Sequence, residues 1–166
     1  MMTAIVRARP LRQFVVQSFL AATVAGVLVA PRPGSAQSAR IDGAGISKVG
    51  FDTRKLTISA QSAGGSGGTG TIRFIHNSPA GLTRFRGTVS CVNARGGTVQ
   101  VTGMIDKGET ATGALLDGKA FAFTIATSSK PQTFSLPIFA DAGAIAACSG
   151  GRPETVPVTE DGFKLQ

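Results

Sequence analysis

Apolar and polar residues alternate with a period of two along most of the chain beyond residue 55. Leu56, Ile58 and Ala60 share one side of such a segment, and the polar residues between them share the other. This alternation is typical of a strand with one buried face. Similar segments lie near residues 72–77, 84–91, 99–105, 121–126, 134–138, 156–158 and 163–165.

Short connections containing Gly, Pro or Asn separate these segments and predict antiparallel hairpins. The connection at 93–97 predicts a three-residue loop, and this register sets Gly87 opposite Gly103. Pro137 cannot donate to a strand ladder, so its segment is expected at an edge or to be irregular. Together these features predict an all-β fold, an antiparallel sandwich or small barrel of about seven or eight strands.

Residues 37–166 are expected to form a single β-domain, because strands of one style lie on both sides of each connection. A stretch of Gly, Ser, Thr and Ala at 63–70 predicts a flexible loop or a hairpin tip within it. The best helix candidate, at 141–148, is interrupted by Gly143 and also fits a strand. Little helix is therefore expected.

Residues 1–36 have the pattern of a secretory signal peptide. Three Arg residues precede an apolar run at 14–30, and small residues follow it. Cleavage is expected between Ala36 and Gln37, which leaves no membrane span. A retained membrane anchor is the alternative, since the apolar run reaches the lower length limit of a spanning helix. We expect a secreted or extracytoplasmic protein.

The chain has two cysteines, Cys91 and Cys148, which allow one disulfide. An even number of cysteines in an exported chain favours a disulfide. The bridge would close a loop of about 57 residues and stabilise the fold by about 4 kcal/mol. A nucleophilic or metal-binding Cys is the alternative, but neither residue has a His nearby in the sequence.

The composition gives no support for a cofactor or metal. One His and two Cys are too few for a Cys/His zinc site, and the nine acidic residues are scattered. Residues 64–68 match G-x-S-x-G, and Gly65, Gly67 and Gly70 match G-x-G-x-x-G. Both motifs need a following helix, whereas a strand is predicted here. These matches reflect the glycine content, and no cofactor is expected.

His76 is the only histidine and the only candidate general base of this type. A hydrolase would combine it with a serine nucleophile and an orienting carboxylate, for which no spacing singles out a partner. The candidates are Ser78, Ser90 and Ser149 for the nucleophile, and Asp106 and Asp141 for the carboxylate. The alternative is a histidine at a strand end beside a turn, and we expect no catalytic residue.

Three arginines predict a basic surface. Residues 37–166 contain 13 basic and 9 acidic side chains, a net charge of +4. The turn at 77–81 places Arg73 near Arg86, with Arg84 on the same face. Like charges directly opposite each other destabilise a strand pair, so either solvent screens them or an anion binds there. With no Trp or Tyr to stack on bases, nucleic acid is not the expected anion.

Parts of the chain resemble small exported β-domains of uncharacterised secreted bacterial proteins. The similar segments are Gly70 to Phe74, Gly87 to Gly103, Gly118 to Thr124 and Asp161 to Leu165. The resemblance implies a compact β-fold and export, and it supplies no catalytic residue.

We therefore expect an exported, non-enzymatic β-module that binds a partner or ligand at or outside the cell surface, such as a cell-wall polymer or another protein. One alternative is a barrel that carries a small apolar ligand, with room left at Gly87 and Gly103. The other is a secreted hydrolase that uses His76.

Overall fold

The computed structural model describes residues 38–63 and 67–166, which form strands and no helix. The predicted signal peptide and its cleavage site between Ala36 and Gln37 lie outside the described residues. The strands are β1 (Arg40–Val49), β2 (Asp52–Ser62), β3 (Gly68–Ser78), β4 (Gly81–Arg95), β5 (Thr98–Glu109), β6 (Ala120–Ala126), β7 (Thr133–Ser135), β8 (Ile138–Ala140), β9 (Thr155–Pro157) and β10 (Glu160–Leu165).

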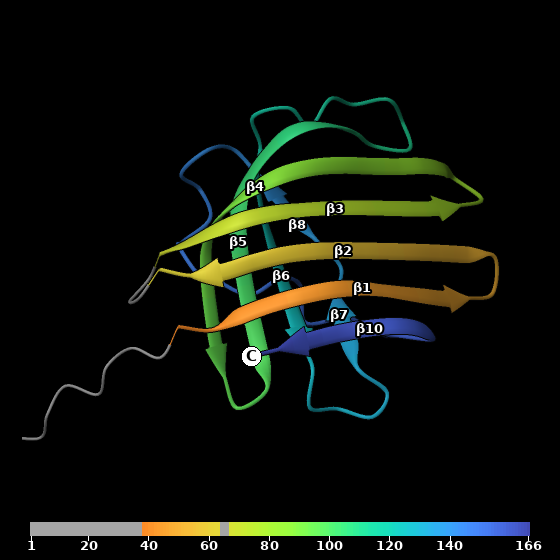
Figure 1. Ribbon diagram of the computed structural model, residues 1–166. Helices are drawn as coiled ribbons and strands as arrows, with labels where there is room; N and C mark the ends of the chain where they lie inside the picture. The colour runs from red at the N-terminus through yellow and green to blue at the C-terminus, as the bar shows by residue number, and fades with distance from the viewer. Residues whose placement is uncertain (1–37, 64–66) are drawn as a thin grey trace, which may run out of the picture. The chain divides into compact units, whose positions relative to one another are not determined.

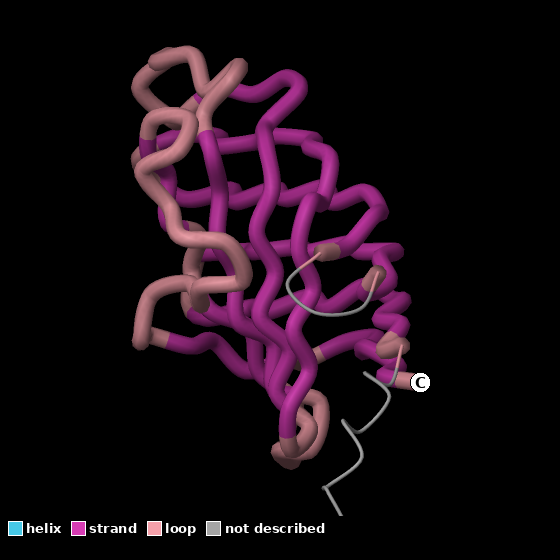
Figure 2. Tube along the Cα trace, turned by 90° about the vertical axis from the view of Figure 1, so that its left-hand side faces the viewer, coloured by secondary structure: helices cyan, strands magenta, loops and turns pink. Residues whose placement is uncertain are grey.

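The described strands form one antiparallel sheet in the order β10-β1-β2-β3-β4-β5-β6-β7-β9, with β8 also paired to β6. The sheet curls into a half-barrel around its apolar face (Figures 1 and 2). The all-β class is confirmed. The ten strands exceed the predicted seven or eight for two reasons: β1 carries little apolar signal, and the segment around Pro137 divides into β7 and β8.

β1 was missed because its inward positions are small. Ile41, Gly43, Gly45 and Ser47 face the interior, and only the first is a large apolar residue. The ring of Phe163 from β10 occupies the space where a side chain at Gly45 would lie, since a Cβ there would sit 2.6 Å from ring atoms. The packing of β10 over β1 therefore replaces the apolar side chains that a strand usually supplies itself.

The β4–β5 hairpin has a tighter turn than expected. Its turn consists of Gly96 and Gly97, whose φ angles of 55° and 77° suit a two-residue type I′ turn. The predicted three-residue loop is wrong, and so is the predicted facing of Gly87 and Gly103. Gly87 instead faces Ile105, while Val89 faces Gly103. The position of the turn displaces the register from the predicted one, and a bulge between Val89 and Cys91 shifts it back by one residue.

Phenylalanine rings fill the interior of the half-barrel. Phe74 of β3 contacts Phe123 of β6, with ring centroids 5.5 Å apart, and Phe85 of β4 contacts Phe121 of β6 at 5.8 Å. These four rings are at most 3% exposed. These contacts join strands two and three places apart in the sheet order, so the sheet must curl around the rings. Each buried ring contributes about 1.5–3 kcal/mol.

Gly87 and Gly103 provide space for Phe121. A Cβ at Gly103 would lie 2.1 Å from the Thr88 carbonyl oxygen and 2.7 Å from the Phe121 ring, and one at Gly87 would lie 2.9 Å from the same ring. The lack of a side chain at both glycines therefore lets an aromatic ring approach the backbone of β4 and β5 closely.

The predicted disulfide between Cys91 and Cys148 is present, with a Cα–Cα distance of 5.2 Å. It ties β4 to residues 141–151, which form turns rather than the helix or strand considered from the sequence. Backbone N–H groups of Cys148 and Gly151 donate to the hydroxyls of Thr102 and Thr124, at 3.1 and 3.0 Å. This segment therefore covers β5 and β6.

The Gly-rich connection joins β2 to β3. β3 begins at Gly68, so the last three residues of the loop expected at 63–70 belong to this strand instead. The hairpin turn after β3 agrees with the prediction, because Ser78 faces Gly81 and Arg73 faces Arg86.

Candidate anion-binding cleft

Three basic side chains form a row on the outer face of the sheet. Arg73 of β3 lies directly opposite Arg86 of β4, which in turn lies opposite Lys107 of β5. Cross-strand neighbours have Cβ atoms about 4.5–5.5 Å apart. The predicted proximity of Arg73 and Arg86 is confirmed, and Lys107 extends the row by one strand.

The sequence analysis missed Lys107 because a bulge changes the alternation of β5. Strict alternation through Val101, Gly103 and Ile105 would turn Lys107 toward the interior. The register shift between Arg86 and Gly87 instead leaves both Asp106 and Lys107 exposed on the outer face. Asp106 accepts a hydrogen bond from the Thr88 hydroxyl at 3.2 Å.

Arg84 occupies the next outward position along β4 and is held by Glu109 of β5. Its Nε and Nη2 atoms lie 2.9 and 2.8 Å from the Glu109 Oε1 atom. The two side chains are 61% and 41% exposed, so solvent screens this pair and its stabilisation is small. The pair fixes the direction of Arg84 beside the row.

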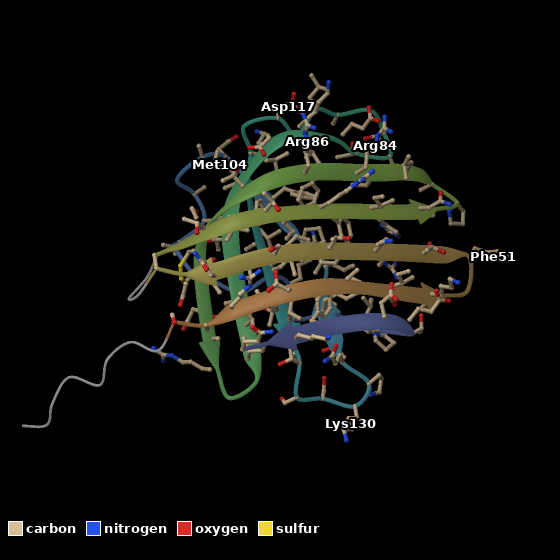
Figure 3. The ribbon with its side chains drawn as sticks, in the orientation of Figure 1. Phe51, Arg84, Arg86, Met104, Asp117 and Lys130 are labelled. Carbon is tan, nitrogen blue, oxygen red and sulfur yellow. A yellow bond between two sulfur atoms is a disulfide. The ribbon has the colours of Figure 1, made fainter. Side chains whose placement is uncertain are left out.

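These side chains line an open cleft of about 490 Å³. The connection at 110–119 forms part of its wall, where the Asp117 Oδ1 atom accepts a hydrogen bond from the Gly108 N–H at 2.8 Å. Arg84, Arg86 and Asp117 point from neighbouring parts of this region in Figure 3. The lining residues are Arg73, Arg84, Phe85, Arg86, Lys107, Gly108, Glu109, Leu115 and Asp117.

The cleft carries an excess of positive charge. Its described lining has four basic and two acidic side chains, a net charge of +2. Within the described part of the chain, the ion pairs recorded for this cleft join Arg84 to Glu109 and leave Arg73, Arg86 and Lys107 without a carboxylate. A concave surface with an excess of one sign of charge concentrates counter-ions, so this cleft suits an anion.

No family model, curated protein or solved structure matches this chain. The resemblance to exported bacterial β-domains therefore stays a prediction, and functional conclusions depend on the geometry.

His76 lies on the inner face of β3, away from the partners considered for it. Its Nε2 atom is 3.5 Å from the Asp52 Oδ2 atom, and that carboxylate also pairs with Arg54. The combinations considered for a hydrolase do not assemble around His76. Ser78 and Ser90 donate to the carbonyls of Gly81 and Thr102, while the candidate carboxylates Asp106 and Asp141 bond to Thr88 and Lys119. Ser149 belongs to the 141–151 segment over β5 and β6.

Asp52 was missed although an inward charge in a strand is itself a signal. Asp52 and Arg54 occupy alternate positions that continue the inward face of Leu56, where apolar residues are expected. Ser47, Arg54 and His76 form a row across β1, β2 and β3. In each of them one buried polar atom has no hydrogen-bond partner among the described residues. The contact with Asp52 would orient the imidazole of His76. Among the described residues, however, no serine hydroxyl forms a hydrogen bond with that imidazole.

The described residues contain no group of three or more His, Cys, Asp or Glu side chains placed to hold a metal ion. They also include no helix of the length and apolarity needed to span a bilayer. The disulfide is compatible with an extracytoplasmic location, where such bonds persist.

Proposed function

We propose that the mature chain is an exported, non-enzymatic β-module that binds an anionic partner in the outer cleft. The observation that carries this proposal is the row of Arg73, Arg86 and Lys107, which lies beside Arg84 and forms no ion pair with a carboxylate of the described residues. Three adjacent cations repel one another. A bound anion would remove this repulsion.

The shape of the cleft favours a partner that presents several anionic groups, as a polymer or an acidic protein segment does. The cleft is open along the sheet, and its cations come from three neighbouring strands, so they can contact several anionic groups of one chain. A cell-wall polymer has this character. The aromatic residue of the described lining, Phe85, is 3% exposed and therefore offers no surface for stacking a base.

Binding of fluorescently labelled inorganic polyphosphate tests this function. We expect the unmodified chain to bind, with an affinity that falls as salt screens the charges. Replacing both Arg73 and Arg86 by Ala should weaken binding at least about tenfold, because each charge-assisted contact contributes about 1.5–3 kcal/mol before solvent screening.

Lys130→Ala is the matched control, because Lys130 is an exposed cation far from the cleft (Figure 3). It should change the affinity little. Absence of polyphosphate binding by the unmodified chain would contradict the proposal. Equal weakening by Lys130→Ala and by the double variant would also contradict it, because binding would then follow net charge alone.

One observation favours a second function, the hydrolase, namely the contact between His76 and Asp52. Loss of a hydrolytic activity of the purified chain in His76→Ala would support it, and unchanged activity would end it. The alternative function as a carrier of an apolar ligand needed empty space at Gly87 and Gly103. The ring of Phe121 occupies that space, so this feature does not support a carrier.

A further inference from the structure

Exposed apolar side chains gather at one end of the sheet. Phe51 is 91% exposed and Val49 is 51% exposed at the β1–β2 turn, and Leu82 is 40% exposed beside the β3–β4 turn. Both turns lie at the same end of the sheet (Figure 1), and Phe51 marks the tip of its hairpin in Figure 3. Single exposed apolar residues are ordinary, but three at the tips of two neighbouring hairpins form a patch. We call these three residues the apolar tips.

Basic side chains follow directly behind the apolar tips on the outer face. Lys55 of β2 and Arg84 of β4 lie in one cross-strand row, on either side of Ile75. The row of Arg73, Arg86 and Lys107 comes next, two residues further along each strand. The outer face therefore changes from apolar to cationic over about 7–14 Å, given about 3.4 Å per residue.

Nearby carboxylates cancel only part of this charge, since the two acids in the cleft lining leave a net charge of +2. Asp52 pairs with Arg54 on the inner side of β2, Glu109 pairs with Arg84, and Glu160 pairs with Lys48. Among the described residues of the two basic rows, Lys55, Arg73, Arg86 and Lys107 have no recorded ion pair. The apolar tips match an apolar layer, and the cations behind them match an anionic layer above it. A binding surface that fits both is apolar in its interior and anionic at its outer boundary.

We propose that this end of the sheet docks on an anionic lipid membrane surface. The apolar tips enter the boundary between headgroups and acyl chains, which lies about 5–10 Å deep for interfacial segments. That depth brings Arg84 and Lys55 to the level of the lipid phosphates, and the cleft cations contact the headgroups above it. This inference rests on the proposed anion binding by the cleft and names an anionic membrane as the partner.

The absence of Trp and Tyr from the sequence makes insertion directly measurable. In a Phe51→Trp variant of the full chain, position 51 is the sole indole emitter. Vesicles containing phosphatidylglycerol should shift its emission to the blue, and pure phosphatidylcholine vesicles should shift it less. Met104→Trp is the matched control, because Met104 is also exposed on the outer face but lies at the other end (Figure 3). Its emission should not shift.

Vesicle sedimentation with two further variants separates this proposal from the cleft proposal. Phe51→Ser should lower binding to phosphatidylglycerol vesicles about tenfold or more, since burying a Phe side chain contributes about 1.5–3 kcal/mol. It should leave polyphosphate binding unchanged. Replacing Arg73 and Arg86 by Ala should weaken both. The apolar segment at 14–30 is common to all variants, so differences among them report on the sheet.

Equal vesicle binding by Phe51→Ser and the unmodified chain would overturn the membrane inference while leaving polyphosphate binding intact. An equal blue shift of Met104→Trp and Phe51→Trp would overturn it as well. Failure of the unmodified chain to bind polyphosphate would instead remove the proposed function on which the inference rests.

Discussion

Asp42 on β1 shows how one exposed carboxylate links stability to pH. Arg40 donates to it at 2.5 Å and the Ser59 hydroxyl donates at 2.6 Å. These hydrogen bonds, the one from Arg40 foremost, hold the pKa of the Asp42 carboxyl below its ordinary value. The folded pKa therefore lies below the unfolded one.

We expect this carboxylate to stabilise the fold at neutral pH and to lose its contribution as the pH falls through the lowered pKa. In Asp42→Asn, the urea midpoint should fall slightly at neutral pH and should converge on that of the unmodified chain in acid. The matched control is Glu154→Gln, an exposed acid without a recorded ion pair in the described residues. A constant difference between Asp42→Asn and the unmodified chain at every pH would contradict this interpretation.

The residues of the cleft and the inner row were predictable to different degrees. Arg73 and Arg86 could be paired from the sequence because a short hairpin turn fixes the register around it. Lys107 could not, since strict alternation gives the wrong face at a bulge. Asp52 is 24 positions before His76, and only the pairing of β2 with β3 brings their side chains together.

At the scale of elements, strand prediction depended on whether a strand supplies its own buried side chains. β2 to β6 alternate large apolar residues with polar or small ones, and all five were predicted. The inward face of β1 becomes apolar only through the ring of Phe163, which packs over Gly45. The failure at β1 therefore has a tertiary cause.

The disulfide is an element-scale constraint, because it joins β4 to a segment without regular structure. Replacing both Cys91 and Cys148 by Ser should destabilise the fold by up to about 4 kcal/mol, since the bridge closes 57 residues. Urea unfolding measures the loss. Adding a reducing agent to the unmodified chain should reproduce it and leave the double variant unchanged.

Two reactive thiols in the folded, unreduced protein would contradict the bridge. An unchanged urea midpoint in the double variant would show that the 141–151 segment is held by its hydrogen bonds to Thr102 and Thr124 instead.

For the whole molecule, Gln132 connects the two ends of the curled sheet. Its side chain accepts from the Phe163 N–H at 2.8 Å and donates to the Phe163 carbonyl at 3.0 Å, as a neighbouring strand would. The rings of Phe134 and Phe163 lie beside this contact, with centroids 6.2 Å apart. The free edge of β10 is therefore covered by the Gln132 side chain, next to the packed rings of Phe134 and Phe163.

Gln132→Ala should lower the unfolding free energy by about 1–3 kcal/mol, because it leaves two backbone groups of Phe163 without these partners. Amide hydrogen exchange should show the largest loss of protection in β10. Gln61→Ala, at an exposed position on β2, is the control and should have little effect. Loss of protection spread equally over all strands would contradict a specific role in closing the sheet.

The sequence by itself determined the strand class, the central hairpins, the single disulfide and the basic pair Arg73–Arg86. Local alternation and short turns decide the strands, the hairpins and the basic pair, and they act over neighbouring residues. The disulfide follows instead from the presence of only two cysteines in the sequence. Only the tertiary structure decided the curl of the sheet, the register past the bulges, the role of β1 and the companions Lys107 and Asp52. Those features depend on contacts between residues far apart in the chain, where one ring, one bulge or one side chain such as Gln132 selects among arrangements that the local pattern permits equally.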